Sequence, residues 1–328
     1  MDGAILYLIV ALAFAALLAA FIVKDIVVRR MHGGRYRWRE SIASYGMLAP
    51  SLILAVLFVL LPIVFSLGYA FTDYRLGNAA VGAVKFNGLQ NFKLIFKNLA
   101  AKGNVLTALE NTGLFVVMVV PLQIILALCL ALIVNHKMRG MGIFKVLFFA
   151  PQVISLTVTS FLWLRILENS DVGLLNAFLG KLHMGRKDFL GSRYSAMVWI
   201  VIISAWQGAG YQMLIFLSGL QNVRKELYEA ASLDGAGKWR QFWSVTLPGL
   251  QSTSVFIIIT VFIGACKVMV QPMLMTPNNN SMVTMNLLMY NQGYRAGMVG
   301  YSSALALVMT VVIGAVTLVQ RYALREKD

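Results

Sequence analysis

The chain has 328 residues, of which 59% are hydrophobic and only 12% are charged, whereas soluble domains carry about 25% charged residues. This composition excludes an ordinary soluble protein and indicates an integral membrane protein with room for about six to eight spans of 20 residues each. The net charge of +15 would suit nucleic acid, but the placement of the basic residues, described below, favours a topology signal, so no nucleic-acid partner is expected.

Seven apolar runs predict an all-α integral membrane protein with about seven transmembrane helices. No basic segment precedes the first run and a strongly basic stretch follows it, so a retained anchor is predicted rather than a cleaved signal peptide. The predicted spans are 4–23, 47–71, 113–134, 146–164, 196–219, 253–275 and 299–320.

The basic residues divide unevenly between the two sides that seven spans would create. Lys and Arg are about twice as dense on one side, which the positive-inside rule assigns to the cytoplasm. The N-terminus is therefore predicted outside and the C-terminus inside. The predicted cytoplasmic segments are 24–40, 135–145, 220–248 and 321–328, and the opposite set is 71–108, 168–193 and 276–298.

One polar stretch, Arg224–Pro248, interrupts the apolar sequence on the predicted cytoplasmic side. Helical spacing predicts two short helices, and Gly235 and Gly237 between them can adopt the positive φ that a bend needs. The face of the first helix is formed by Leu227, Ala230, Ala231 and Asp234, and the second helix carries Trp239, Phe242 and Trp243.

This stretch resembles the EAA loop of binding-protein-dependent ABC importer permeases, and it is called the EAA loop below. The family pattern is Glu-Ala-Ala, three residues, Gly, nine residues, Ile, one residue and Leu-Pro. Val245 stands where the family prefers Ile, and Arg224 stands where the similar carbohydrate-uptake branch, the maltose and glycerol-phosphate permeases, often has Pro. The matching residues are Glu229, Ala230, Ala231, Gly235, Leu247 and Pro248.

The resemblance covers nearly the whole chain after about residue 45 and implies the architecture and the partners. It implies a permease domain at 41–328, made of a six-helix core with the EAA loop at 224–248, preceded by an N-terminal anchor and basic linker at 1–40. It also implies a bacterial inner-membrane complex with a second permease subunit, expected to be a paralogue, two ATP-binding subunits and a solute-binding protein. Asp234 and Trp239 are expected to join the matching residues in contacting the ATPase.

The chain lacks the motifs of an enzyme. Gly237-Lys238 is followed by Trp239, and Ser232 stands where the first glycine of a P-loop belongs, so no phosphate-binding loop is predicted. The three histidines are dispersed, which excludes an H-E-x-x-H zinc site, and no G-x-S-x-G elbow is present. A non-catalytic subunit with no cofactor or metal is therefore expected, with ATP and Mg held by the partner ATPase.

Polar residues inside spans are candidates for the solute pathway, because they are expensive in a bilayer and usually face a cavity or another helix. Gly208 and Gly210 lie beside some of these candidates and predict an interruption of the fifth span. Helix–helix hydrogen bonding is the alternative role for the Ser, Thr and Gln residues, and Lys267 could instead extend to the interface beside Gln271. The candidates are Gln207, Tyr211, Gln212, Trp206, Lys267, Ser155 and Thr159.

The sequence therefore predicts the permease subunit of an ATP-driven importer, forming half of the pathway for a sugar or oligosaccharide. A permease for a non-sugar solute remains an alternative. An ion-coupled secondary transporter is less favoured, because such proteins usually carry paired intramembrane carboxylates and no acidic residue lies deep within any predicted span.

Overall fold

The structure is a computed structural model that describes residues 38–76, 84–135, 140–277 and 280–324. It divides into two compact units, one from residues before 93 with Ala296–Leu307, the other from Lys93–Arg295 with the residues from Val308 onward. The regular elements in these ranges are helices, with one isolated antiparallel bridge between Thr72 and Phe86. The predicted all-α class is confirmed.

The first unit is dominated by one long apolar helix. Its parts are α2 (Trp38–Ala55), a π-helical turn (Val56–Leu60) and α3 (Leu61–Tyr69), and the stretch Gly46–Tyr69 is long and apolar enough to cross a membrane. Between Gly46 and Tyr69 no apolar side chain is buried within the protein, as suits a helix whose solvent is lipid. The chain turns after the end of α3. Asn91 Nδ2 stabilises this turn by donating to the carbonyls of Ala70 (2.9 Å) and Thr72 (2.8 Å).

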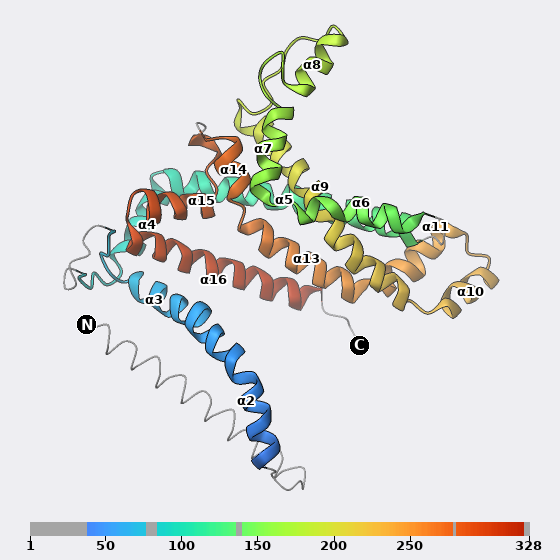
Figure 1. The fold of residues 1–328 in the computed structure, drawn as a ribbon, viewed down its shortest axis with the longest axis horizontal. Helices are drawn as coiled ribbons and strands as arrows, with labels where there is room; N and C mark the ends of the chain where they lie inside the picture. The colour runs from blue at the N-terminus through green and yellow to red at the C-terminus, as the bar shows by residue number, and fades with distance from the viewer. Residues whose placement is uncertain (1–37, 77–83, 136–139, 278–279, 325–328) are drawn as a thin grey trace. The chain divides into compact units, whose positions relative to one another are not determined.

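The second unit is built on two long helices, α5 (Asn104–Asn135) and α9 (Arg193–Asn222), which pack along each other. Helix α6 (Met141–Val153) packs on α9, and α13 (Gln251–Cys266) packs on both long helices (Figure 1). Two further helices extend across the boundary between the units in sequence, α4 (Gln90–Ala100) and α16 (Val299–Ala323).

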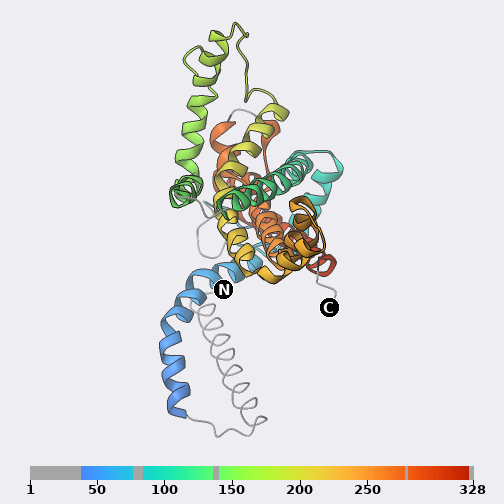
Figure 2. The ribbon, with the colours of Figure 1, turned by 90° about the vertical axis from the view of Figure 1, so that its right-hand side faces the viewer.

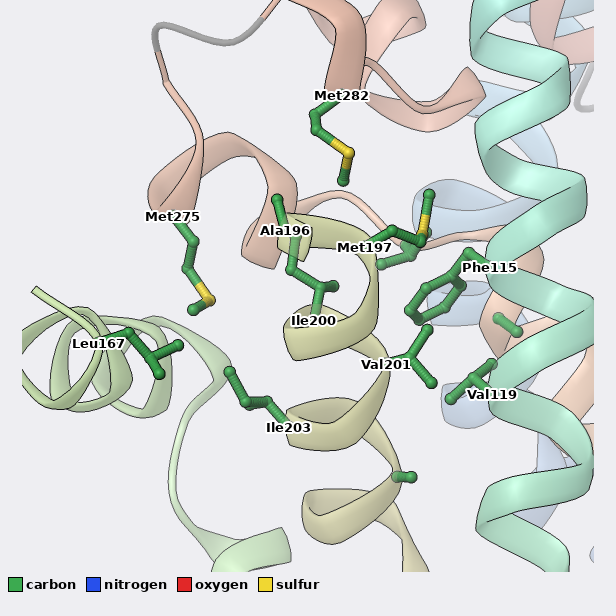
Figure 3. Packing of buried hydrophobic residues seen from close by; sticks show 13 residues of the cluster. Phe115, Val119, Leu167, Ala196, Met197, Ile200, Val201, Ile203, Met275 and Met282 are labelled. Carbon is green, nitrogen blue, oxygen red and sulfur yellow. The ribbon is translucent and has the colours of Figure 1, made fainter. Parts of the chain in front are cut away.

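Figure 3 shows the main apolar cluster of the second unit. Phe115 and Val119 of α5 face Met197 and Val201 of α9, and all four side chains are nearly or fully buried. The helix α9 can bury side chains on most of its circumference because neighbours surround it, whereas α5 and α13 expose more of their apolar surface. The cluster fixes the spacing of α5 and α9 around the polar cavity described below.

Two spans of the second unit are broken. Helix α6 ends at Val153, α7 (Leu156–Ile166) leaves it at an angle of 97°, and α8 (Leu174–Lys181) lies at the far end of α7 (Figure 2). The span Gln251–Met275 is broken between α13 and α14 (Val270–Met275), and α14 packs against α7. A 3-10 turn (Asn280–Met282), α15 (Met285–Tyr290) and a π-helical turn (Asn291–Arg295) follow.

Five helices in the described residues are long and apolar enough to cross a membrane, or six if the bent pair α6–α7 is one span. The sequence predicted about seven, but its first span, 4–23, lies outside the described residues. The domain assignment of 1–40 and 41–328 therefore stays a prediction. The span predicted at 146–164 is wrong as one continuous helix, because Ile154 is extended (ψ 134°) and the Ser155 hydroxyl begins a new helix by accepting from the Val158 amide.

The predicted interruption at Gly208 and Gly210 is also wrong, because α9 is continuous from Arg193 to Asn222. The glycines serve close packing instead. A Cβ on Gly210 would collide with the main-chain carbonyl of Phe148 in α6, and one on Gly208 would collide with the side chain of Gln123 in α5. Small residues at such crossings let helix backbones approach.

Candidate functional site

The EAA loop consists of α10 (Lys225–Leu233), a bend and α11 (Lys238–Gln241), followed by a π-helical turn (Phe242–Thr246) and α12 (Leu247–Gly249). Gly235 has φ +75°, a conformation that disfavours side chains, and its amide donates to the Ser232 carbonyl at 3.1 Å. The predicted pair of short helices with a glycine bend is confirmed. Gly237 begins α11 with an ordinary φ of −64°.

Three side chains that the sequence analysis did not single out hold this bend. Gln241 is buried and its Nε2 donates to Ser232 Oγ (2.8 Å) and to the Ala236 carbonyl (3.0 Å). The hydroxyls of Tyr228 and Thr246 share a hydrogen bond of 3.0 Å between α10 and the π-helical turn. These contacts join both arms of the bend, so the loop is a rigid body rather than two independent helices.

The loop presents apolar surface although its sequence is polar. Leu233 is 90% exposed and Trp239 is 74% exposed. Trp239 stacks on Phe242 with ring centroids 5.9 Å apart, and Trp243 meets Phe242 edge-on at 5.4 Å. Exposed aromatic residues on a stiff support are typical of binding interfaces. The predicted contact residues Glu229, Ala230, Asp234, Gly235 and Pro248 are exposed, while Ala231 and Leu247 are half-buried.

The second candidate site, called the central cavity below, is a space of about 270 Å³ between α5, α9 and the two broken spans. Six of its lining residues carry amide or hydroxyl groups and Lys267 carries the charge; no Asp or Glu is among the lining residues. Phe115 adds an aromatic face. The polar lining residues are Gln123, Gln152, Ser204, Gln212, Thr260, Lys267 and Gln271.

Three of the four side-chain amides that line the cavity form hydrogen bonds between helices. Gln123 Nε2 of α5 donates to Gln212 Oε1 of α9 at 3.0 Å, and Gln271 Nε2 of α14 donates to Ser204 Oγ of α9 at 3.3 Å. Lys267 caps the C-terminus of α13 and is exposed, and no ion pair involving it is found in the described ranges. The cavity can therefore offer hydrogen bonds and one positive charge to a solute.

Of the predicted pathway residues, Gln212 and Lys267 line the cavity and the others do not. Gln207 is buried and its Nε2 donates to the Ile154 carbonyl at 2.9 Å, at the α6–α7 break. Trp206 packs edge-on against Trp163 at 5.8 Å between ring centroids. Tyr211 and Ser155 are exposed and Thr159 is buried, and none of the three is among the lining residues of the cavity. Their roles in transport stay predictions.

Gln152, Ser204 and Thr260 line the cavity and were missed. A single hydroxyl or amide in an apolar run does not show which face of its helix lines a cavity. Pro272 was an available signal for the second break, since it stands in the first turn of α14, where a missing amide N–H costs nothing. Within the described ranges no group of three or more His, Cys, Asp or Glu could hold a metal ion.

Comparison with known proteins shows the family. Residues 99–326 match the family described as binding-protein-dependent transport system inner membrane component. The arabinooligosaccharides transport system permease protein AraP of Bacillus subtilis (strain 168) is 30% identical, over 86% of this chain and 90% of its own length. The lactose transport system permease protein LacF of Rhizobium radiobacter is 30% identical, over 85% of this chain and 93% of its own.

A solved structure has the same fold. It is the bacterial alginate ABC transporter in complex with its alginate pentasaccharide-bound periplasmic protein, of which one chain is 20% identical to this one with a TM-score of 0.75, over 88% of this chain and 98% of that chain. Helical spans, EAA loop, family match and curated relatives agree, and the chain belongs to the family of inner membrane components of binding-protein-dependent transport systems.

Proposed function

We propose that this chain is the permease subunit of an ATP-driven importer, forming half of the membrane pathway for a carbohydrate delivered by a solute-binding protein. The EAA loop faces the cytoplasm, the N-terminus lies outside, and a separate ATPase subunit that binds ATP and Mg grips the loop. A second permease subunit, a paralogue, completes the pathway, and a second ATPase subunit grips its loop.

One observation carries this proposal. The EAA loop connects α9 to α13, and both helices line the central cavity, α9 through Ser204 and Gln212 and α13 through Thr260. Helix α9 runs without a break from the cavity to the loop. Ten residues of helix separate Gln212 from Asn222, about 15 Å, so a displacement of the loop is transmitted to the cavity wall by a stiff element.

The carbohydrate class is supported by two independent facts. The curated relatives AraP and LacF, each covered over most of their length, are named for arabino-oligosaccharide and lactose transport. The central cavity is lined by side-chain amides, hydroxyls and the Phe115 ring, the groups that form hydrogen bonds and stacking contacts with a polyhydroxylated ring. A non-sugar solute would meet the same amides and hydroxyls and the single positive charge of Lys267.

The test is uptake into proteoliposomes that contain the assembled complex with its ATPase subunits. Three probes suit the relatives: an arabino-oligosaccharide, lactose and an alginate oligosaccharide. We expect that at least one accumulates only with ATP on the ATPase side and the cognate binding protein on the other. Accumulation driven by an ion gradient, without ATP or binding protein, would instead establish the alternative of an ion-coupled transporter.

A further inference from the structure

The wall of the central cavity contains a break in the helical backbone. Helix α13 ends at Cys266 and α14 begins at Val270, and the five consecutive residues 267–271 all line the cavity. Met269 at the break has φ −145° and ψ −48°, outside helical values. The shape of this wall therefore depends on whatever holds residues 267–269 in place.

A helix end leaves its last carbonyl groups without intrahelical donors, and inside a membrane protein such groups must find other partners. Two side chains donate to the carbonyls at the C-cap of α13 and one residue beyond it. Thr284 Oγ1 donates to the Val268 carbonyl at 2.7 Å, and Asn286 Nδ2 donates to the Lys267 carbonyl at 3.0 Å. Thr284 is 1% exposed, so its hydroxyl is shielded from solvent.

The segment that carries Thr284 and Asn286 is itself fixed to α5. Asn111 Nδ2 donates to the carbonyls of Ser281 (2.7 Å) and Val283 (2.8 Å). The Met285 amide donates to Thr112 Oγ1 at 2.9 Å. Both α5 residues are essentially buried, at 0% and 2% exposure. Alternate residues of the segment thus bond to α5 and to the break.

Helix α9 joins this hydrogen-bond network through its first residue, Arg193. Arg193 Nε donates to Asn111 Oδ1 at 2.7 Å, which leaves both Asn111 N–H groups directed to the two carbonyls of the segment, and Arg193 Nη2 pairs with Glu110 at 3.0 Å. A chain of hydrogen bonds therefore runs from α9 and α5 through residues 281–286 to the break in the cavity wall.

We propose that Thr284 and Asn286 are positioning residues for solute passage. They hold the α13–α14 break in the form that shapes the cavity wall, and Asn111 and Thr112 hold them in turn. The proposal rests on the proposed function, because it takes the central cavity as part of the solute pathway. A role limited to anchoring α15 on α5 would leave the break and the cavity unaffected by loss of the Thr284 hydroxyl.

The first arm of the test measures the break itself and does not depend on transport. We compare hydrogen exchange of the peptide that contains residues 264–270 in the purified complex for the wild type, Thr284→Val, Thr284→Ser and Thr276→Val. Thr276, the C-cap residue of α14, is the matched control, since its Oγ1 also donates to a carbonyl at 2.8 Å, but to that of Pro272 one turn back. Loss of one buried bond is expected to speed exchange about fivefold in Thr284→Val alone. Unchanged exchange there would overturn the proposal.

The second arm measures molecules of sugar imported per ATP hydrolysed, with whichever of the three probes the complex accumulates. Misfolded or missing complexes lower uptake and hydrolysis in proportion, so the ratio isolates passage. We expect the ratio to fall about threefold or more in Thr284→Val and in the half-buried Asn286→Ala, to recover in Thr284→Ser, and to be unchanged in Thr276→Val.

The outcomes separate the two hypotheses. If no probe is imported with ATP, the carbohydrate proposal fails while the exchange arm still tests the break. If Thr284→Val speeds exchange but leaves the ratio at the wild-type value, the break is held by Thr284 and is irrelevant to passage, and the positioning role is overturned. Asn286→Ala guards against a Thr284→Val chain that does not assemble.

Discussion

At the scale of single residues, buried amide side chains repeatedly donate hydrogen bonds to main-chain carbonyls at or near helix ends. Gln207 donates to the Ile154 carbonyl at the α6–α7 break, Asn111 to two carbonyls before α15, and Gln241 to the Ala236 carbonyl in the EAA loop. An amide can both donate and accept, so it joins segments that no backbone ladder connects. These residues fix geometry and do not themselves face the cavity.

Gln241 gives the sharpest prediction at this scale. Gln241→Leu keeps the bulk of the side chain but leaves the Ala236 carbonyl and Ser232 Oγ without this donor. We expect the loop to lose about 1–3 kcal/mol of local stability, and binding of the ATPase subunit to weaken accordingly. The measurement is the yield of ATPase subunit that co-purifies with a tagged permease at equal membrane abundance.

Ser244→Ala is the control for Gln241→Leu, because Ser244 is exposed and its hydroxyl donates to the Arg240 carbonyl one turn back in the same segment, so it does not join the two arms of the bend. It should co-purify the ATPase subunit like the wild type. Equal yields from Gln241→Leu and Ser244→Ala would show that the amide does not stiffen the loop for binding.

The residues of the EAA loop were predictable because the pattern that marks them is local in sequence. The spacing of Glu229, Gly235 and Pro248 along the sequence does not depend on how the neighbouring helices pack. Gln241 could not be assigned in this way, since its partners become neighbours only after the chain has turned at Gly235. Trp206 and Tyr211 could likewise be assigned to a span from the sequence, but not to a side of α9, and neither lines the central cavity.

At the scale of elements, the spans differ in what the sequence could reveal. The length of an apolar run and its hydrophobic periodicity locate a helix in the sequence. The described long spans lie close to their predicted ranges. The breaks were missed because the apolar runs continue through them. Ser155 and Pro272 are each helix-start residues, yet inside a membrane such residues are also tolerated in unbroken helices. Whether a span breaks depends on donors from distant parts of the chain, such as Gln207 in α9 and Thr284 just before α15.

The contact between α6 and α9 provides a prediction at this scale. In Gly210→Ala the new methyl group would collide with the Phe148 carbonyl and approach Phe149 Cα to 2.9 Å. Backbone atoms cannot rotate away, so the helices must separate, and we expect a loss of about 1–3 kcal/mol. The measurement is the midpoint of unfolding of the purified permease in a mild detergent.

Gly264→Ala is the matched control for Gly210→Ala, since Gly264 also lies in a span beside the cavity but has no atom within 4 Å of a new Cβ. This change should leave stability equal or raise it by up to about 1 kcal/mol through helix propensity. A Gly210→Ala chain as stable as Gly264→Ala would contradict the close packing of α6 on α9.

At the scale of the whole molecule, the described part of the chain joins a surface for a partner to a space for a solute. The EAA loop lies between α9 and α13 in sequence, and the two helices meet again at the central cavity. Sequence alone could place the loop between two spans but could not show that both spans share one cavity, because that follows from packing against α5. The orientation in the membrane and the anchor at 4–23 stay predictions.

The bend at Gly235 provides the prediction that tests this connection. Gly235 has φ +75°, whereas proline fixes φ near −65° and has no N–H to donate to the Ser232 carbonyl. In Gly235→Pro the two arms of the EAA loop must rearrange, while the spans should still insert because their sequences are untouched. We expect ATPase co-purification to fall about tenfold or more, because keeping the native bend with a residue that disfavours positive φ costs about 1–3 kcal/mol. Gly237→Ala is the control, since Gly237 has φ −64° and open space around a new Cβ, and Gly235→Asn should be intermediate because asparagine tolerates positive φ. If Gly235→Pro retained both the ATPase subunit and ATP-dependent uptake, the loop could not be the element through which ATP hydrolysis reaches the cavity.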